Sequence, residues 1–384
     1  MERVPPWVAP WLVVVVLVAA ATGRSARADP QVPCYFVFGD SLVDNGNNND
    51  IASLARANYP PYGIDFPGGA TGRFSNGLTT VDAISRLLGF DDYIPAYAGA
   101  NNDQLLSGVN FASAAAGIRD ETGQQLGQRI SLGGQLQNYQ AAVQQLVSIL
   151  GDEDSAANHL SQCIFTVGMG SNDYLNNYFM PAVYSTSRQY TPEQYADVLV
   201  SQYTQQLRVL YNNGARKVAL MGVGQVGCSP NELAQQSSDG VTCVARINGA
   251  IEIFNQKLVE LVDQFNTLPG AHFTYINAYG IFQDILRPDG AEQGMLRGGE
   301  EQRAGDLPAL PDAVRQQERV PLLGRLPPHG GRQHPRREEG LQRRRPLRRP
   351  PRRPADACAP LVILYTQPPS QKRRMGYIYR SRAS

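Results

Sequence analysis

The chain has 384 residues, 42% of them hydrophobic, which is enough for a sizeable core and excludes wholesale disorder. Its net charge of +1 is the sum of an acidic and a basic part. Residues 29–293 carry 12 Lys/Arg against 25 Asp/Glu, whereas residues 294–384 carry 20 Lys/Arg against 8 Asp/Glu. An acidic body lacks the basic surface that nucleic-acid binding requires, so we expect no nucleic-acid partner.

The first 28 residues have the composition of an export signal. Arg3 precedes an apolar run, residues 11–21, that is too short to span a bilayer comfortably. The small residues of Ala26-Arg27-Ala28 form the pattern at which signal peptides are cleaved. We therefore predict a secretory signal at 1–28, a secreted mature chain and no stable membrane span. A retained signal anchor is the alternative.

Apolar, β-rich runs alternate with helical patterns from residue 33 onward. The strand-like runs are residues 34–40, 108–112, 163–169, 217–223 and 272–277, and the helical patterns are residues 78–89, 132–150, 192–213 and 244–267. Continuous apolar runs are typical of parallel strands buried on both faces. Thr191 followed by Pro192 is a favourable helix start. The alternation predicts an α/β fold, a parallel sheet flanked by helices on both faces, over residues of about 33–290.

The five cysteines are Cys34, Cys163, Cys228, Cys243 and Cys358. Their spacing shows neither a Cys-x-x-Cys motif nor a Cys/His cluster, so we expect no metal site. Export permits disulfide bonds. Cys228 and Cys243 flank a polar stretch, and a disulfide between them would close it as a loop.

Polar residues follow the first predicted strand, which ends in Phe38-Gly39-Asp40-Ser41-Leu42. In doubly wound sheets, sites form at the carboxyl ends of strands. Ser41 is therefore well placed to act as an exposed nucleophile, with Gly39 permitting close approach of the backbone. Taken alone, the tripeptide Gly39-Asp40-Ser41 favours an ordinary turn rich in Asp, Ser and Gly over a nucleophile.

Two further blocks follow later strand-like runs: GVNFASAAAG at 108–117 and GMGSNDY at 168–174. A loop of small residues can offer a backbone N–H group, and an Asn amide can offer a side-chain N–H group. Together with the Ser41 N–H group they could form an oxyanion hole with three donors.

Three such blocks in this order resemble the GDSL-motif (SGNH) esterases and lipases of plants. The resemblance extends from about residue 34 to about residue 288 and includes GRFSNG at 72–77. It implies an SGNH-hydrolase, flavodoxin-like three-layer fold. It also implies a secreted serine ester hydrolase of the carboxylesterase or lipase type, which acts on lipid or wall-associated esters through an acyl-enzyme and needs no cofactor or metal.

By this resemblance Ser41 is the nucleophile, and Gly117 and Asn172 donate to the oxyanion. The donor of the second block lies at Gly117 or within two residues of it, because plant relatives often carry Gly where this chain has Ala114 and Ala115.

Acidic and polar neighbours of these residues have less specific roles. We expect Gly39, Asp40 and Asp44 to order the first loop rather than to transfer protons. Tyr174 and Asn176 either line the pocket or lie at the surface.

A serine nucleophile needs a general base, and the base needs an orienting partner. The family supplies both from a C-terminal Asp-x-x-His. The residues three positions before the four histidines of this chain are Ala156, Pro269, Leu326 and Gly331. His159 and His272 are weak candidates, and His329 and His334 lie in an Arg/Pro-rich segment that we expect to be disordered. We therefore expect the base and its Asp to be absent and turnover to be impaired.

The codons that could encode the basic segment, residues 294–384, suggest how this segment arose. With permitted codons read one nucleotide later, residues 294–299 give Gly-Cys-Cys-Gly-Val. Residues 322–329 give Phe-Trp-Asp-Ala-Phe-His-Pro in the same way, and the two stretches supply the family's missing blocks. We hypothesise a frameshift near residues 288–293, so that 29–293 is a C-terminally incomplete hydrolase domain and 294–384 an out-of-frame tail. A genuine basic tail that binds acidic polymers or membrane surfaces is the alternative.

A site at these strand ends is also compatible with two other functions. One is non-hydrolytic binding of an acyl or glycan ligand, and the other is transfer of the acyl group to an alcohol. The acyl group and the oligomeric state are left open.

Overall fold

The computed structural model describes residues 29–286 of the chain. The described residues up to Phe282 belong to one compact unit, and Gln283 begins a second unit of which only residues 283–286 are described. The predicted secretory signal, the predicted out-of-frame tail, His329, His334 and Cys358 lie outside the described residues.

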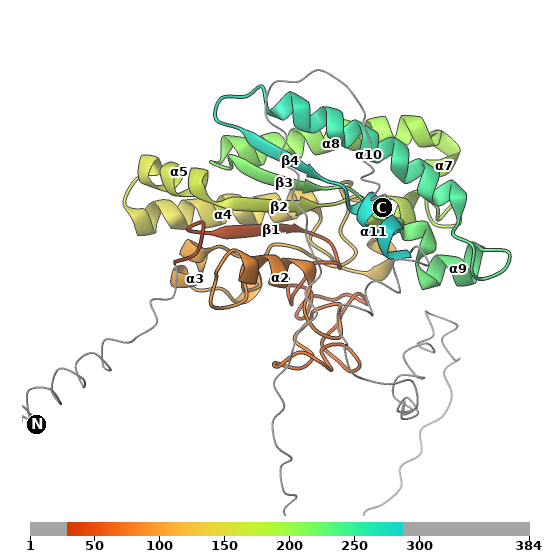
Figure 1. The fold of residues 1–384 in the computed structure, drawn as a ribbon, viewed down its shortest axis with the longest axis horizontal. Helices are drawn as coiled ribbons and strands as arrows, with labels where there is room; N and C mark the ends of the chain where they lie inside the picture. Colours follow the sequence, from red (N-terminus) through yellow and green to blue (C-terminus); the bar gives the residue numbers. More distant parts are fainter. Residues whose placement is uncertain (1–28, 287–384) are drawn as a thin grey trace, which may run out of the picture. The chain divides into compact units, whose positions relative to one another are not determined.

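A four-stranded parallel sheet forms the centre of the first unit (Figure 1). In the order β1-β2-β3-β4, its strands are β1 Tyr35–Gly39, β2 Ile164–Gly168, β3 Lys217–Met221 and β4 His272–Ile276. The register pairs Gly39 with Gly168 and Gly168 with Met221. The carboxyl ends of the first three strands are therefore level, and the loops that follow them start side by side.

The predicted strand at 108–112 is only partly formed. The segment lies parallel to β1, but it is joined to that strand by a single isolated bridge between Asn110 and Val37. The Asn110 side chain donates to the Val43 carbonyl over 2.6 Å, and its Oδ1 accepts from the Ala112 N–H group over 2.9 Å. Backbone hydrogen bonds also join the segment to β1, from the Val37 N–H group to the Val109 carbonyl and from the Phe111 N–H group to the Val37 carbonyl.

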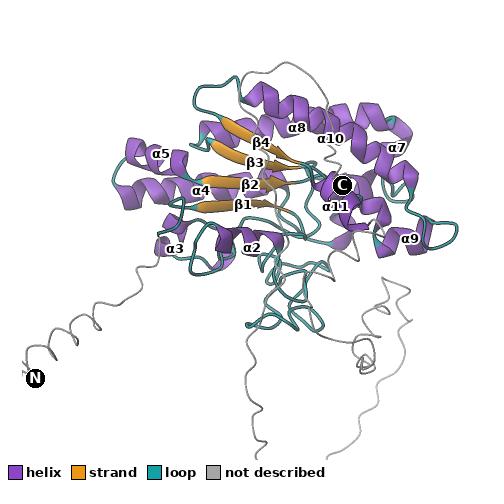
Figure 2. Cartoon of the chain, in the orientation of Figure 1, coloured by secondary structure: helices purple, strands orange, loops and turns teal. Residues whose placement is uncertain are grey.

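Figure 2 shows helices around the sheet and a long loop region, without helix or strand, between β1 and α2. The α-helices are α2 Thr80–Leu87, α3 Asn102–Ser107, α4 Leu132–Leu150, α5 Glu153–Gln162, α6 Ser171–Asp173, α7 Thr186–Gln189, α8 Pro192–Asn212, α9 Pro230–Gln236, α10 Ala245–Phe265 and α11 Ala278–Leu286. The four predicted helical patterns coincide with α2, α4, α8 and α10. The predicted start of α8 is confirmed, because Thr191 and Gln194 exchange the two bonds of a capping box.

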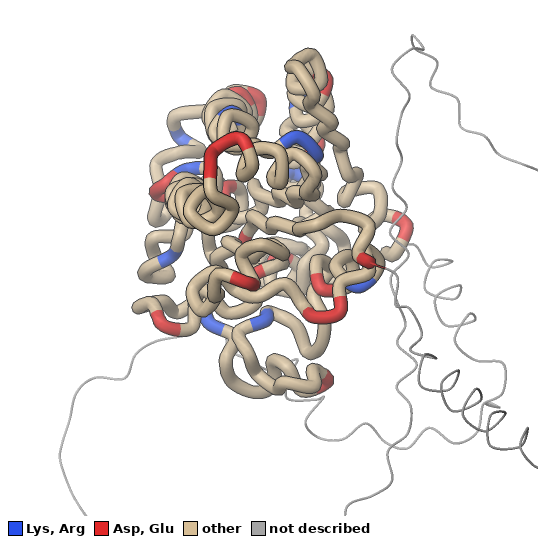
Figure 3. The backbone as a smooth tube through the Cα atoms, turned by 90° about the vertical axis from the view of Figure 1, so that its left-hand side faces the viewer, with Lys and Arg blue, Asp and Glu red and all other residues tan. Residues whose placement is uncertain are grey.

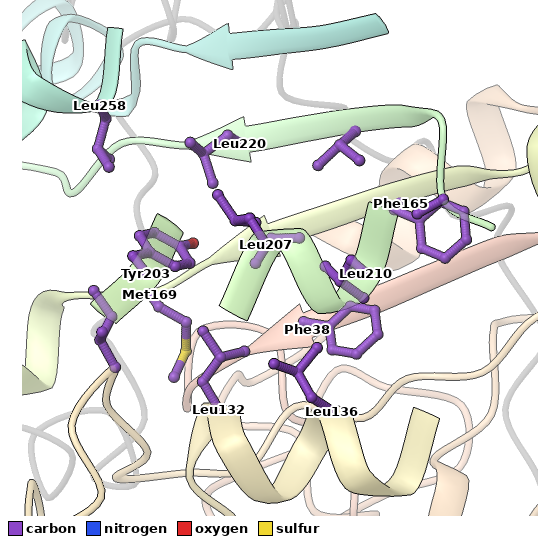
Figure 4. Close-up of a cluster of buried hydrophobic side chains, with 14 of the residues drawn as sticks. Phe38, Leu132, Leu136, Phe165, Met169, Tyr203, Leu207, Leu210, Leu220 and Leu258 are labelled. Carbon is purple, nitrogen blue, oxygen red and sulfur yellow. The ribbon is translucent and has the colours of Figure 1, made fainter. Parts of the chain in front are cut away.

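Side chains of β1 alternate between the two faces of the sheet, as a strand requires. Phe36 and Phe38 belong to a large core that also contains buried residues of α4, α8 and α10, and Figure 4 shows part of it. Tyr35 and Val37 belong to a second core with Val81 of α2. Burying a Phe side chain contributes roughly 2–3 kcal/mol, so both layers are firmly held. The predicted α/β architecture, with helices on both faces, is confirmed.

Two disulfide bonds lie within residues 29–286. Cys228–Cys243 is the pairing expected from the polar stretch between them. Cys34–Cys163 joins the residues that precede β1 and β2, which the parallel register brings together because Tyr35 pairs with Ile164.

Figure 3 shows Lys and Arg positions dispersed among Asp and Glu positions on the described backbone. In the described part of the chain no helix is both long and apolar enough to cross a membrane.

Candidate active site

Three polar loops meet at the carboxyl edge of the sheet. Ser41 follows β1, Gly117 follows the segment beside β1, and Asn172 follows β2. The first two loops are joined by a hydrogen bond from the Ala114 N–H group to Asp44 Oδ2, 2.9 Å. The last two are joined by a bond of 2.9 Å from Asn172 Nδ2 to the Ala116 carbonyl. The structure thus brings all three predicted blocks together.

The turn that carries Ser41 is fixed at its start by Gly39. A Cβ atom on Gly39 would lie 2.5 Å from Val43 Cγ2 and 3.2 Å from the Gly168 carbonyl oxygen, so a side chain does not fit. Gln135 of α4 binds the same peptide group twice, because its Nε2 donates to the Gly39 carbonyl and its Oε1 accepts from the Gly39 N–H group. Ser41 itself is half-buried.

Sequence reasoning missed Gln135. The available signal was a polar amide at a buried position of an otherwise apolar helix face. The partner of that amide is 96 positions away in the chain, and only the fold reveals it.

Two buried carboxyl groups organise the first loop. Asp40 Oδ1 accepts from the Leu42 N–H group over 3.0 Å. Asp44 accepts from the N–H groups of Gly46 and Asn47 as well as from the second block. Burial raises the pKa of Asp40 to about 7 and that of Asp44 to about 6, although the hydrogen bonds oppose the shift. Both groups therefore bind backbone rather than standing free in a cleft.

Asp173, which follows Asn172, is a functional candidate that sequence reasoning did not single out. Its carboxylate accepts from the N–H groups of Ile118 and Arg119 and from the Thr122 hydroxyl, at 2.8–3.1 Å. It is completely buried, and burial raises its pKa to about 6. Asp173 ties the third block to the loop after the second, as Asp44 ties the second block to the first.

These carboxyl groups make stability depend on pH. Their folded pKa values exceed the value of about 4 expected in an unfolded chain, so the folded state binds more protons between about pH 4 and 7. The free energy of unfolding therefore falls as the pH rises through this window. From Asp40 alone we expect a loss of about 2 kcal/mol between pH 5 and pH 8.

Urea unfolding followed by circular dichroism checks this expectation. Asp40→Asn removes one of the three ionisations and should make the fall in stability with pH smaller. A wild-type chain that is as stable at pH 8 as at pH 5 would contradict it.

Gly117 occupies a position where no side chain fits. A Cβ atom there would lie 2.5 Å from Thr122 Cγ2 and 2.7 Å from Asp173 Oδ1. The nearby Ala114 N–H group donates to Asp44, and the Ala116 N–H group donates to the Ser113 carbonyl. Two of the backbone N–H groups in this stretch are therefore engaged, which favours Gly117 or Ala115 as the donor of the second block.

Ala115 has φ +65°, and within residues 29–286 it is the only non-glycine residue with positive φ. A Cβ atom in this left-handed conformation costs about 1 kcal/mol. We therefore expect Ala115→Gly to raise the free energy of unfolding by about 1 kcal/mol. Ala116→Gly, at a buried neighbour with ordinary φ, is the matched control and should lower it. Equal losses in the two variants would contradict the assignment of strain to Ala115.

Asn172 is buried and held from two sides. Its Nδ2 donates to the Ala116 carbonyl, and its Oδ1 accepts from Asn176 Nδ2 over 2.7 Å. An amide nitrogen carries two hydrogens, so the second one can face a bound substrate.

Tyr174 neither lines the pocket nor lies at the surface. Its side chain is completely buried in an aromatic cluster with Tyr178, Tyr195 and Phe254.

The two described histidines lie at the amino edge of the sheet. His159 Nε2 is 3.3 Å from Cys34 Sγ, just before β1 begins, and His272 is the first residue of β4. A strand of five residues is roughly 16 Å long, so neither histidine can reach Ser41 at the opposite edge.

The same edge holds a group of residues with metal-ligand chemistry. The ligand atoms of Cys34, His159 and Cys163 lie within 4.8 Å of one another. Sequence spacing did not reveal this cluster, because the fold assembles it from distant segments. The disulfide bond uses both sulfurs, and zinc requires thiolates, so the bonded pair is not a zinc site.

Comparison with known proteins agrees with this geometry. Residues 35–313 match the model of the family described as GDSL-like Lipase/Acylhydrolase. The GDSL esterase/lipase At5g45670 of Arabidopsis thaliana is 65% identical over 276 residues, which cover 72% of this chain and 76% of the relative. The GDSL esterase/lipase At4g18970 of the same plant is 67% identical over 262 residues, 68% of this chain and 73% of the relative. The chain therefore belongs to the plant GDSL-like lipase/acylhydrolase family, which is a family of ester hydrolases.

Proposed function

We propose that the site is that of a serine ester hydrolase in which Ser41 is the nucleophile. The N–H group of Ser41, a backbone N–H group at Gly117 or Ala115, and the Asn172 side chain bind the oxyanion. The observation that carries this proposal is the meeting of three donor loops at one sheet edge, held together by Asp44 and Asp173.

In this mechanism Ser41 Oγ forms a bond to the acyl carbon and gives its proton to a general base. The alcohol takes that proton as it leaves, and water then releases the acid from the acyl-enzyme. The donors act on the negative charge that develops in the transition state, which is where such preorganised groups contribute most.

We further propose that residues 294–384 are the product of a shifted frame and that the native chain carries the Asp-x-x-His. The reversal of charge, the lack of Phe, Trp and Asn in this segment, and the two family blocks in the shifted reading support this. Without its base, turnover should be lower by roughly 10³-fold or more.

Secretion, with residues 1–28 as the signal, is part of the proposal and rests on the pattern of the first 28 residues. The proposed substrate classes are lipid acyl esters, cutin-type polyesters and acetylated wall polysaccharides.

Imidazole tests the site in the chain as it stands, since it can replace a missing histidine as a soluble base. We expect slow hydrolysis of p-nitrophenyl butyrate that added imidazole accelerates beyond the rate with imidazole alone, and we expect Ser41→Ala to abolish this protein-dependent increment. Ser201→Ala, at an exposed position of α8, is the control and should keep it.

An increment that survives in Ser41→Ala would contradict the proposal. Ligand binding without turnover, unaffected by Ser41→Ala, would favour a binding protein. A new ester formed when an alcohol acceptor is present would indicate a transacylase.

A further inference from the structure

An asparagine can serve an oxyanion hole in only one of its two amide orientations. The nitrogen donates to the developing charge, whereas the oxygen would repel it. Rotation by 180° about the last side-chain bond exchanges the two atoms at little steric cost. The orientation of Asn172 therefore has to be set by its neighbours.

The structure contains a row of side chains that leads away from Asn172. Asn176 Nδ2 donates to Asn172 Oδ1 over 2.7 Å, and Gln125 Nε2 donates to Asn176 Oδ1 over 3.0 Å. The Tyr184 hydroxyl lies 2.5 Å from Gln125 Oε1 and 3.1 Å from the Glu121 carbonyl, and its single hydrogen is donated over the shorter contact. Every amide oxygen in the row is thus occupied by a donor of the next residue.

The direction of the row is fixed at Asn172. The Ala116 carbonyl accepts from Asn172 Nδ2, so a turned amide would face that carbonyl with its own oxygen. The turned amide would also point its nitrogen at the nitrogen of Asn176. Each of these contacts sets a donor against a donor or an acceptor against an acceptor.

The local backbone brings these residues together. Tyr174–Tyr178 is a π-helical turn in which Asn176 departs from helical geometry, with φ −109° and ψ 22°. Such insertions are frequent at functional sites because they redirect a side chain. The Asn176 carbonyl accepts from the Gly123 N–H group, which holds the short turn of Gln125 against the π turn.

The neighbouring Asn177 shows what a purely structural amide looks like in this turn. It is completely buried, its Nδ2 donates to the Thr122 hydroxyl, and its Oδ1 accepts from the Thr186 hydroxyl. Neither of these side-chain bonds reaches Asn172. Asn176 is less buried than Asn177, and its side-chain nitrogen donates a hydrogen bond to Asn172.

We propose that Asn176, Gln125 and Tyr184 form a positioning relay that holds the Asn172 amide in its donating orientation. The relay rests on the proposed oxyanion role of Asn172, and its members are positioning residues that touch no reacting atom. It extends the site from the sheet edge to the loop before α7.

Asn176→Asp tests the relay with almost no change of shape. A carboxylate at position 176 would repel Asn172 Oδ1, whereas it would accept from Asn172 Nδ2 once the amide has turned. A hydrogen bond to a charged acceptor is stronger than the neutral bond to the Ala116 carbonyl, so the amide should turn. Gln125→Glu removes the donor one step further along, at a half-buried position where folding is less at risk. Gln124→Glu places the same charge on the exposed neighbour in the same short turn and is the matched control.

Two measurements distinguish the relay, which orients the Asn172 amide, from the proposed oxyanion role of Asn172. The first is the side-chain amide signal of Asn172 in ¹⁵N-resolved NMR spectra, identified by its loss in Asn172→Ala. We expect it to shift in Asn176→Asp and in Gln125→Glu, and to stay in place in Gln124→Glu. The second is the imidazole-dependent rate that requires Ser41. We expect Asn176→Asp to lower the kcat of this imidazole-dependent hydrolysis roughly 10- to 100-fold, and to change its KM less than about twofold.

An Asn172 signal that stays in place in Asn176→Asp would overturn the relay, as would equal shifts in Gln124→Glu and Gln125→Glu. If the signals move as expected but Asn172→Ala leaves the Ser41-dependent rate unchanged, the relay holds the amide and the proposed oxyanion role of Asn172 fails.

Discussion

A chain whose reading frame is restored between residues 288 and 293 is expected to hydrolyse p-nitrophenyl butyrate at least about 10³-fold faster than the 384-residue chain. Within residues 29–286 the site already holds the serine turn and two carboxylate-bound loops. Both described histidines lie at the opposite edge of the sheet. Under the proposed frame, the change adds a histidine to accept the proton of Ser41.

Comparison of kcat/KM for the two chains measures this gain. The control is the restored chain with its new histidine replaced by alanine, which should return to the rate of the 384-residue chain. Equal rates before and after restoration would mean that the basic segment removes nothing that catalysis needs.

In the restored chain, Asn172→Ala should lower kcat by about 10²- to 10³-fold and leave KM nearly unchanged. An oxyanion donor is worth most in the transition state, where the carbonyl oxygen carries its charge, so its loss appears in kcat. Its removal also leaves Asn176 without its acceptor.

Asn158→Ala, at an exposed position of α5, is the matched control and should keep the parental kcat. A rise in KM with unchanged kcat in Asn172→Ala would show that Asn172 binds the substrate without stabilising the transition state.

The regular elements could largely be predicted from the sequence because their signals are local. Continuous apolar runs identified all four strands, and the cap at Thr191 identified the start of α8. The segment 108–112 has the same apolar character and hydrogen-bonds to β1, yet it forms only one bridge pair with that strand, and its Asn110 side chain bonds to the Val43 carbonyl. The bond to Val43 depends on a contact with the first loop, which a local pattern does not contain.

The site could be predicted as three loops, since chemistry selects Ser, Asn and small residues at strand ends. The residues that hold those loops could not. Gln135 binds Gly39 across 96 positions, and Asp173 binds Ile118 across 55. Each of these contacts depends on the strand register and the helix packing. The Cys34–Cys163 bond has the same origin, because only the pairing of β1 with β2 places the two sulfurs together.

The central claim is that Ser41 is the nucleophile, and covalent labelling tests it most directly. A fluorophosphonate transfers its phosphonyl group to an activated serine, and peptide mass spectrometry locates the label. In the restored chain we predict one label, on the peptide that contains Ser41, and none in Ser41→Ala. Labelling of another residue, or an unlabelled Ser41 in a chain that still hydrolyses esters, would contradict the account.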